Sequence, residues 1–264
     1  MYKLRMMNRK NNLLLFINAL FIAVSSCKPP QTTMLANAEM EGTVRKGSEV
    51  RFETFKKGTL QPHDIVLFDA NWKEEDFVST KFLRIVGMPG DKFQIDSGNI
   101  FVNGRLSSLP TSSKFSFYVR FKDAPSSSVL TKYFNRQATK FEYYFFLDES
   151  EAIRVKQFPE VDSFSRLISE KNFVEEEIIG DSKFIGRNSY FLGPLYIPKI
   201  GDFITSEVLR LIPNYLTEAD LGKTITDHYF YLVGDNRFFA MDSRYLGLVP
   251  EKSIKGRMVS VSTK

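Results

Sequence analysis

The chain has 264 residues, 43% of them hydrophobic and 25% charged, which is the composition of a globular protein with one sizeable core or a core carrying an insertion. Its formal net charge of +5 is unevenly placed, because residues 1–26 hold four basic residues and no acidic one, which leaves 32 basic against 31 acidic residues elsewhere. That balance excludes a generally basic surface, so nothing argues for nucleic-acid binding. The single cysteine, Cys27, excludes a disulfide within one chain.

Residues 1–26 have the pattern of a secretion signal. A basic start leads into an apolar run from Leu13 to Val24, shorter than the roughly 20 residues that a membrane-spanning helix needs. The following Val24-Ser25-Ser26-Cys27 resembles the lipobox of bacterial lipoprotein signals, which implies cleavage before Cys27 and acylation of its sulfur. Residues 27–35 are then a short tether. The alternative is an uncleaved anchor with an incidental cysteine, and both interpretations attach the chain to a membrane.

Residues 36–105 are expected to form short strands joined by tight turns. A turn is predicted at 45–48, and strands are predicted at 50–52, 64–68, 82–86 and 99–102. Pro89-Gly90 suits a type II turn, since proline sets φ at one position and glycine accepts positive φ at the next. Asn103-Gly104 after a strand is a strong hairpin signal.

Residues 106–225 form a region of different character, dense in aromatic residues. Phe115, Phe117, Val119 and Phe121 alternate at strand period, and 141–147 is a second aromatic strand. The charged stretch 163–179 is a candidate helix, and Gly193-Pro194 and Gly201-Asp202 are turn signals.

The chain returns to a strand at 228–233. The sequence therefore predicts a mainly β fold with little helix. An antiparallel core of residues 36–105 and 226–264 is interrupted by a β-rich insertion domain at 106–225.

Four separated segments resemble type I signal peptidases (leader peptidases). The strongest is Gly234-Asp-Asn-Arg-Phe-Phe-Ala-Met-Asp-Ser-Arg-Tyr-Leu-Gly247, and the second is Arg84-Ile-Val-Gly-Met-Pro-Gly-Asp91 with the Asn103-Gly104 hairpin. Met40-Glu-Gly-Thr-Val44 with Gly47 is weaker, and Gly193-Pro-Leu-Tyr-Ile-Pro-Lys-Ile-Gly-Asp202 is similar to a segment of Bacteroidetes-type signal peptidases. Their order and spacing agree with the family from about residue 36 onward, so the resemblance implies the antiparallel β core of that family.

The resemblance also implies which positions carry the chemistry. Members of this family cut with a serine nucleophile and a lysine general base, and a second serine orients the lysine. The matching positions here are Glu39 for the nucleophile, Leu83 for the base and Ala240 for the orienting group. A lysine base must be desolvated to lose its proton near pH 7, and leucine accepts no proton. The resemblance thus implies a family member without its catalytic groups.

Other residues of the family site are retained. Asp242, Ser243, Arg244 and Arg84 match supporting positions, and the Asp242 and Arg244 pair is expected to be structural. Glu39 would face Leu83 in this fold. Because an unpaired buried carboxylate is costly, we expect Glu39 to reach water, to be protonated, or to pair with Lys81 or Arg84.

Three interpretations of function remain open. The leading one is a lipid-anchored pseudoprotease on the periplasmic side of a bacterial membrane, which binds an extended peptide, a signal-peptide-like segment or an envelope protein without cutting it. The second is an active peptidase with displaced groups, such as Lys81 or Thr43. The third is an envelope scaffold that uses the aromatic insertion.

The predicted peptide cleft combines residues before the Glu39 position with residues of the strand at 82–86: Met34, Ala36, Ala38, Met40, Phe82 and Leu83. No cofactor and no metal site are expected, because His63 and His228 are isolated from other metal-ligating residues. Trp72 lies in a charged loop and is assigned no role.

Overall fold

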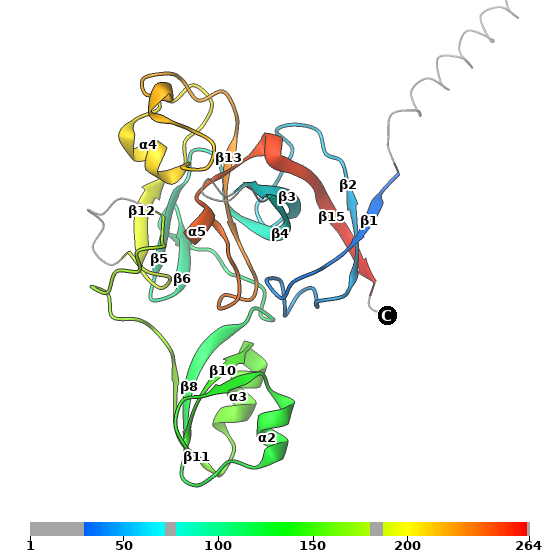
Figure 1. Cartoon of the computed structure of the whole chain (residues 1–264), viewed down its shortest axis with the longest axis vertical. Coiled ribbons are helices and arrows are strands. Elements are labelled where there is room, and N and C mark those ends of the chain that lie inside the picture. The colour runs from blue at the N-terminus through cyan, green and yellow to red at the C-terminus, as the bar shows by residue number, and fades with distance from the viewer. Residues whose placement is uncertain (1–28, 72–77, 180–186, 263–264) are drawn as a thin grey trace, which may run out of the picture.

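The computed structural model describes residues 29–71, 78–179 and 187–262, with 38% strand and 14% helix. The strands pair antiparallel in three sheets, which confirms the mainly β fold. Figure 1 shows a larger body with a smaller lobe below it. The predicted signal peptide, Cys27 and Trp72 lie outside the described residues.

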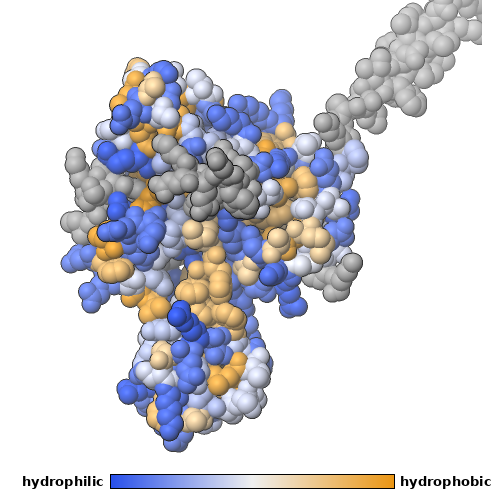
Figure 2. Space-filling model, in the orientation of Figure 1, coloured by the Kyte–Doolittle hydropathy of each residue, from blue (hydrophilic) through white to orange (hydrophobic). Residues whose placement is uncertain are grey.

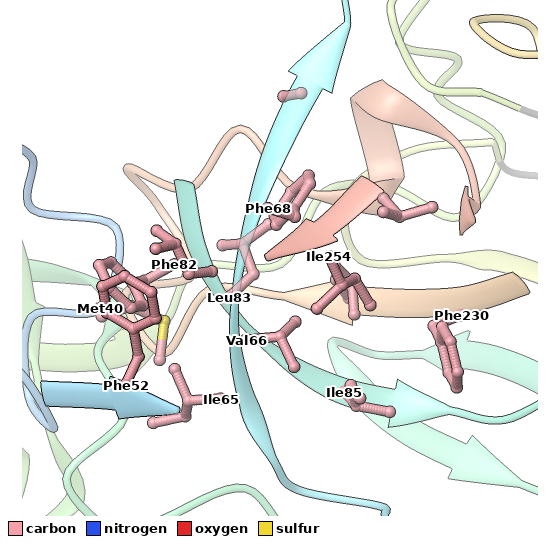
Figure 3. Close-up of a cluster of buried hydrophobic side chains, with 14 of the residues drawn as sticks. Met40, Phe52, Ile65, Val66, Phe68, Phe82, Leu83, Ile85, Phe230 and Ile254 are labelled. Atoms are coloured by element: carbon pink, nitrogen blue, oxygen red, sulfur yellow. The ribbon is translucent and has the colours of Figure 1, made fainter. Parts of the chain in front are cut away.

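The largest sheet joins strands from both ends of the chain. Its seven strands run in the order β1-β2-β15-β3-β4-β13-β14. The bounds are β1 Gln31–Met34, β2 Glu49–Glu53, β3 Ile65–Asn71, β4 Val78–Gly87, β13 Tyr229–Val233, β14 Val249–Pro250 and β15 Ile254–Ser262. Figure 3 shows the hydrophobic core packed against this sheet, with Leu83 beside Val66 and Phe68. Residues 31–34, expected within the tether, instead form the edge strand β1, where Thr32 and Thr33 suit a strand.

A second sheet has the order β12-β5-β6-β7. It contains β5 Lys92–Asp96, β6 Asn99–Val102, β7 Arg105–Leu106 and β12 Leu192–Tyr196. Asn103 and Gly104 have φ of 52° and 76°, the left-handed values that a two-residue hairpin turn requires. Helix α4 (Ser206–Leu211) and β12 pack with β5 and β13 in one hydrophobic cluster that contains Phe93, Leu195 and Tyr231. Part of the predicted insertion region therefore belongs structurally to the larger body.

The smaller lobe is built from residues 115–166. Its sheet has the order β11-β8-β10-β9, with β8 Phe115–Phe121, β9 Asn135–Gln137, β10 Glu142–Leu147 and β11 Val161–Arg166. Helices α2 (Ser127–Lys132) and α3 (Glu149–Lys156) pack with this sheet around Phe121, Phe145 and Val155. The alternating aromatic residues of β8 thus form the core of a separate small lobe (Figure 1).

The helix predicted at 163–179 is wrong. Residues up to Arg166 form β11, and turns follow. Phe164 stacks on Phe117 of the neighbouring strand β8 at 5.1 Å between ring centroids, so pairing with β8 decides the conformation here. The helix that forms nearby, α3, begins at a capping box between Asp148 and Glu151, a signal that was present in the sequence.

Short helical segments complete the described structure. They are η1 Glu218–Asp220, α5 Ser243–Leu246 and η2 Glu251–Ser253. Within residues 29–71, 78–179 and 187–262, no helix is long and apolar enough to cross a membrane.

Candidate functional site

The position that the resemblance assigns to the nucleophile is occupied by half of a buried ion pair. Glu39 lies in the turn between β1 and β2, and Lys81 lies on β4. The two residues are only 4% and 7% exposed, and Lys81 Nζ donates to Glu39 Oε1 at 2.5 Å. Pairing with Lys81 is one of the outcomes expected from the sequence.

The Glu39 carboxylate has further hydrogen-bond donors. Asn37 Nδ2 donates to Oε2 at 2.8 Å, and the Met241 backbone N–H donates to Oε1 at 3.2 Å. Burial raises the pKa of Glu39, while the charge and hydrogen bond of Lys81 act in the opposite direction. Both carboxylate oxygens are therefore engaged by groups of the protein itself. The sequence did not identify Asn37 or the Met241 N–H, because neither has a distinctive motif.

The cation beside Glu39, Lys81, is not at the position that the resemblance assigns to the lysine base. Lys81 and Leu83 lie two residues apart on β4, and side chains at that spacing point to the same face of a strand. Leu83 is fully buried in the hydrophobic core (Figure 3). The position assigned to the base thus contributes packing, while Lys81 reaches residue 39.

The position assigned to the orienting serine is also buried. Ala240 offers only a methyl group there, and Gly234 lies directly against it. A Cβ on Gly234 would stand 2.3 Å from Ala240 Cβ and 2.6 Å from the Glu39 carbonyl oxygen. Asn236 N–H donates to that same carbonyl oxygen at 2.9 Å. The loop from residue 234 to 240 therefore closes tightly over Glu39.

The retained acidic residue Asp242 anchors this loop. It is fully buried, and its carboxylate accepts from Arg237 Nη1 at 2.9 Å and from Arg244 Nε at 2.8 Å. Burial alone would raise the pKa of Asp242, but the charges of Arg244 and Arg237 hold it below the usual value. Ser243 Oγ accepts from the Leu232 N–H at 2.9 Å, tying α5 to β13. Asp242 and Arg244 thus form a buried ion pair within this segment.

Arg84 forms a second buried link. Its Nε and Nη2 donate to Asp235 Oδ1 and Oδ2 at 2.8 Å and 2.6 Å, a bidentate pair that joins β4 to the loop after β13. Strand β4 therefore carries two buried cations, Lys81 before Leu83 in the sequence and Arg84 after it. Each cation is held by a carboxylate from another segment.

The six residues predicted to line a peptide cleft divide into two groups. Met34 is 54% exposed at the end of β1, Ala36 is exposed and Ala38 is partly exposed. Met40, Phe82 and Leu83 are instead buried in the hydrophobic core, Met40 from the turn after β1 and the other two from β4, which lies between β3 and β13. An accessible peptide site at this place would use the β1 edge and not those three residues.

Aromatic residues join the lobe to the loop that covers Glu39. The junction aromatic cluster consists of Phe134, Phe146, Phe238 and Phe239, with Phe146 and Phe238 at 4.1 Å between ring centroids. Three of its members remain substantially exposed: Phe134, Phe238 and Phe239. Figure 2 shows apolar surface where the lobe meets the larger body.

The histidines and Thr43, which the sequence analysis also considered, do not lie in a cluster of reactive side chains among the described residues. Within the described parts of the chain, no three His, Cys, Asp or Glu side chains gather as metal ligands. His63 is exposed in the turn before β3, and His228 lies beside β13. Thr43 is exposed, and its hydroxyl lies 3.4 Å from that of Ser112.

Comparison with known proteins gives a consistent result. The chain matches a family model described as signal peptidase, peptidase S26, over residues 9–187 and 207–263. Signal peptidase IB of Staphylococcus aureus is 31% identical over 93 residues, which are 34% of this chain and 45% of that protein. Signal peptidase I of Buchnera aphidicola subsp. Baizongia pistaciae is 24% identical over 263 residues, which are 94% of this chain and 72% of that protein. The chain thus matches less than half the length of the Staphylococcus relative.

The buried ion pair predicts strong coupling between two substitutions. Glu39→Leu or Lys81→Met alone leaves an uncompensated buried charge and should lower the free energy of unfolding by about 3 kcal/mol or more. The double variant should be about as stable as the unmodified chain, since two apolar side chains replace the pair. Urea unfolding of the four proteins measures the coupling energy. The partly exposed pair Glu53 and Arg257 is the control, with an expected coupling below about 1 kcal/mol. Additive losses at Glu39 and Lys81 would contradict this assignment.

The depressed pKa of Asp242 predicts a loss of stability in acid. Its contribution is complete above the ordinary aspartate value of 3.8 and is lost as pH falls below that value toward the folded-state pKa. Asp242→Asn should therefore weaken the decline of unfolding free energy with falling pH in this window. Urea unfolding from pH 7 to pH 2.5 measures it, with the exposed Asp123→Asn as control. An Asp242→Asn profile parallel to that of the unmodified chain would be the contrary result.

Proposed function

The chain belongs to the signal peptidase, peptidase S26, family, and we propose that it is an inactive member that binds an extended peptide, or a strand-like segment of an envelope protein, without cutting it. The observation that carries the proposal is the Glu39 and Lys81 ion pair at the nucleophile position. A carboxylate whose two oxygens already accept from Lys81, Asn37 and Met241 has no role as a serine-type nucleophile.

The proton transfers of the family reaction lack a carrier in this arrangement. A general base must have a free lone pair within hydrogen-bond reach of the nucleophile. Lys81 is the ammonium partner of the Glu39 carboxylate in an ion pair, and an ammonium group has no lone pair to take a proton. Leu83 and Ala240 add no group that could replace it. Loss of cleavage is therefore compatible with a well-packed site.

An exposed sheet edge supports peptide binding. The strand β1 is at one end of the seven-stranded sheet, so one side of its backbone has no strand partner among the described residues. An extended peptide can add to such an edge through main-chain hydrogen bonds. Met34 and Ala36 supply exposed apolar surface at the end of this strand. In this proposal β1 replaces the deeper cleft expected from the sequence.

Two other functions are alternatives. An active peptidase with displaced groups would need a nucleophile near Lys81, but the Thr43 hydroxyl lies beside Ser112 and Lys81 faces Glu39. An envelope scaffold is favoured by a separate observation, the exposed rings of Phe134, Phe238 and Phe239 where the lobe meets the larger body.

One assay tests cleavage and binding together. The full chain is incubated with a fluorescent signal-peptide reporter, and both product formation and reporter anisotropy are measured. We expect binding without cleavage. Met34→Asp should weaken binding about tenfold, since it places a charge at the apolar end of β1. Leu221→Asp, at an exposed leucine outside this sheet, should have no effect.

Each outcome of this assay favours one function. Cleavage by the unmodified chain that is lost in Lys81→Met would refute the inactive assignment and support displaced catalytic groups. A reporter that is neither bound nor cut would favour the scaffold. An intact signal peptidase in the same assay shows that the reporter is cleavable.

We also propose that the chain is anchored in the bacterial cell envelope by a lipid on Cys27, with the described residues facing the periplasm. The lipobox-like Val24-Ser25-Ser26-Cys27 supports this anchor. Cys27→Ala should move most of the protein from the membrane to the soluble fraction, because it removes the acyl chains. Cell fractionation measures the shift, with Ser25→Ala as the matched control. A Cys27→Ala variant that remains equally membrane-bound would refute the lipid anchor.

A further inference from the structure

A cavity lies between the lobe and the second sheet of the larger body. We call it the junction cavity, and its volume is about 590 Å³, within the range of ligand sites in proteins. Apolar side chains from both parts line it: Ile100, Leu106, Leu109, Phe115, Phe117 and Phe164. Its charged neighbours are Glu149, Lys156 and Arg166. It shares no lining residue with the Glu39 and Lys81 site.

Arg166 is the unusual member of this lining. Its guanidinium carbon lies 4.1 Å from the ring centre of Phe115. Its two terminal nitrogens have only long contacts, 3.3 Å to Asn99 Oδ1 and 3.4 Å to the Gly98 carbonyl oxygen. Its Nε is buried and has no hydrogen-bond partner among the described residues. Burial lowers the pKa of Arg166, which reflects the cost of a cation without a counter-ion.

Arg166 is only partly buried, and the three fully buried arginines among the described residues each have a carboxylate partner. Arg84 is held by Asp235, and Arg237 and Arg244 are held by Asp242. No described carboxylate forms an ion pair with Arg166. A guanidinium with free donors at an apolar cavity is suited to a carboxylate, which would accept two parallel hydrogen bonds.

A smaller hollow of about 270 Å³ adjoins this place and shares Gly98, Phe115 and Arg166 with the cavity. Its other charged groups are already engaged within the protein. Glu175 accepts from Ser189, with 2.9 Å between Oε1 and Oγ. Arg237 and Arg244 are bound to Asp242. Arg166 is therefore the cation that this hollow offers to a ligand, and the exposed Lys156 is a second cation of the junction cavity.

The backbone around the cavity favours an extended peptide as the source of that carboxylate. Phe164 and Arg166 belong to β11, and Leu106 belongs to β7. Each of these strands is the end strand of its sheet, so one side of its backbone has no strand partner among the described residues. Such edges offer main-chain donors and acceptors to an added strand. A fatty acid would use the same cation and apolar walls but not the edges.

We propose that the junction cavity binds the C-terminal end of an extended apolar peptide, with its terminal carboxylate on Arg166 and its last side chains against Phe164 and Leu106. This second peptide site is independent of the β1 edge and of the proposed function. A partner that ends in an apolar residue could occupy it while another segment lies on β1.

The test compares peptides that differ only at the terminus. The full chain is titrated into fluorescein-labelled Gly-Ser-Val-Leu-Phe with a free carboxylate, the same peptide as an amide, and the free acid in the presence of decanoate. We expect the acid to bind about tenfold more tightly than the amide, which is the effect of one charge-assisted interaction. Arg166→Gln should remove this preference. Leu106→Ser, at an exposed wall residue, should weaken both peptides.

Matched variants separate this site from the rest of the molecule. Arg120→Gln changes an exposed arginine on β8 outside the cavity and should alter neither affinity. Met34→Asp should leave the ratio of the acid and amide affinities unchanged, so a failure of the β1 proposal does not decide this one. Thermal unfolding checks that Arg166→Gln is folded. Equal affinities for acid and amide, an unchanged preference in Arg166→Gln, or binding of decanoate without binding of the peptide acid would overturn the proposal.

Discussion

The burial of β4 on both faces is the constraint on which the site depends. An interior strand has no water to solvate charged side chains, yet this strand carries Lys81 and Arg84. Each cation is therefore matched by a carboxylate from a different segment, Glu39 and Asp235. The backbone bond from Asn236 to the Glu39 carbonyl oxygen then joins these two segments to each other. Three of the four segments that resemble signal peptidases are thus connected through β4.

This arrangement separates the architecture of the family from its reaction. The strands, the Asn103-Gly104 hairpin and the Asp242 cluster hold the loops in place. None of these contacts requires a reactive group. The residues at the assigned reactive positions instead add burial, in the case of Leu83 and Ala240, or an internal ion pair, in the case of Glu39. The fold can therefore be kept by packing and charge pairing alone.

Much of the fold could be predicted because its signals are local. The hairpin turn follows from Asn103-Gly104, and the lobe strand β8 follows from alternating aromatic residues. The candidate site was predictable where a motif fixed the register, as for the position of Glu39, whose pairing with Lys81 was one of several expected alternatives. Other features depend on contacts between distant segments. Phe164 is in a strand because it stacks on Phe117, and Met40 and Phe82 are buried because neighbouring strands cover them.

The contacts between the lobe and the larger body could not be predicted from the sequence either. Arg166 is an ordinary residue of a charged stretch until folding places it against Phe115 and Gly98. Its lack of a carboxylate partner is a property of the assembled surfaces and not of any motif. The same is true of the residue 187–225 region, whose strand β12 pairs with β5 across about one hundred residues of sequence.

The ion pair between Glu39 and Lys81 has a consequence for the evolution of this chain. A single substitution at either residue leaves a buried charge without its partner and lowers the free energy of unfolding by about 3 kcal/mol or more. The total free energy of unfolding of a protein is typically about 5–15 kcal/mol. A variant with a serine at position 39 would therefore be clearly less stable unless Lys81 changed as well. The pair thus couples the two positions in evolution, because a substitution at one of them is tolerated better when the other changes as well.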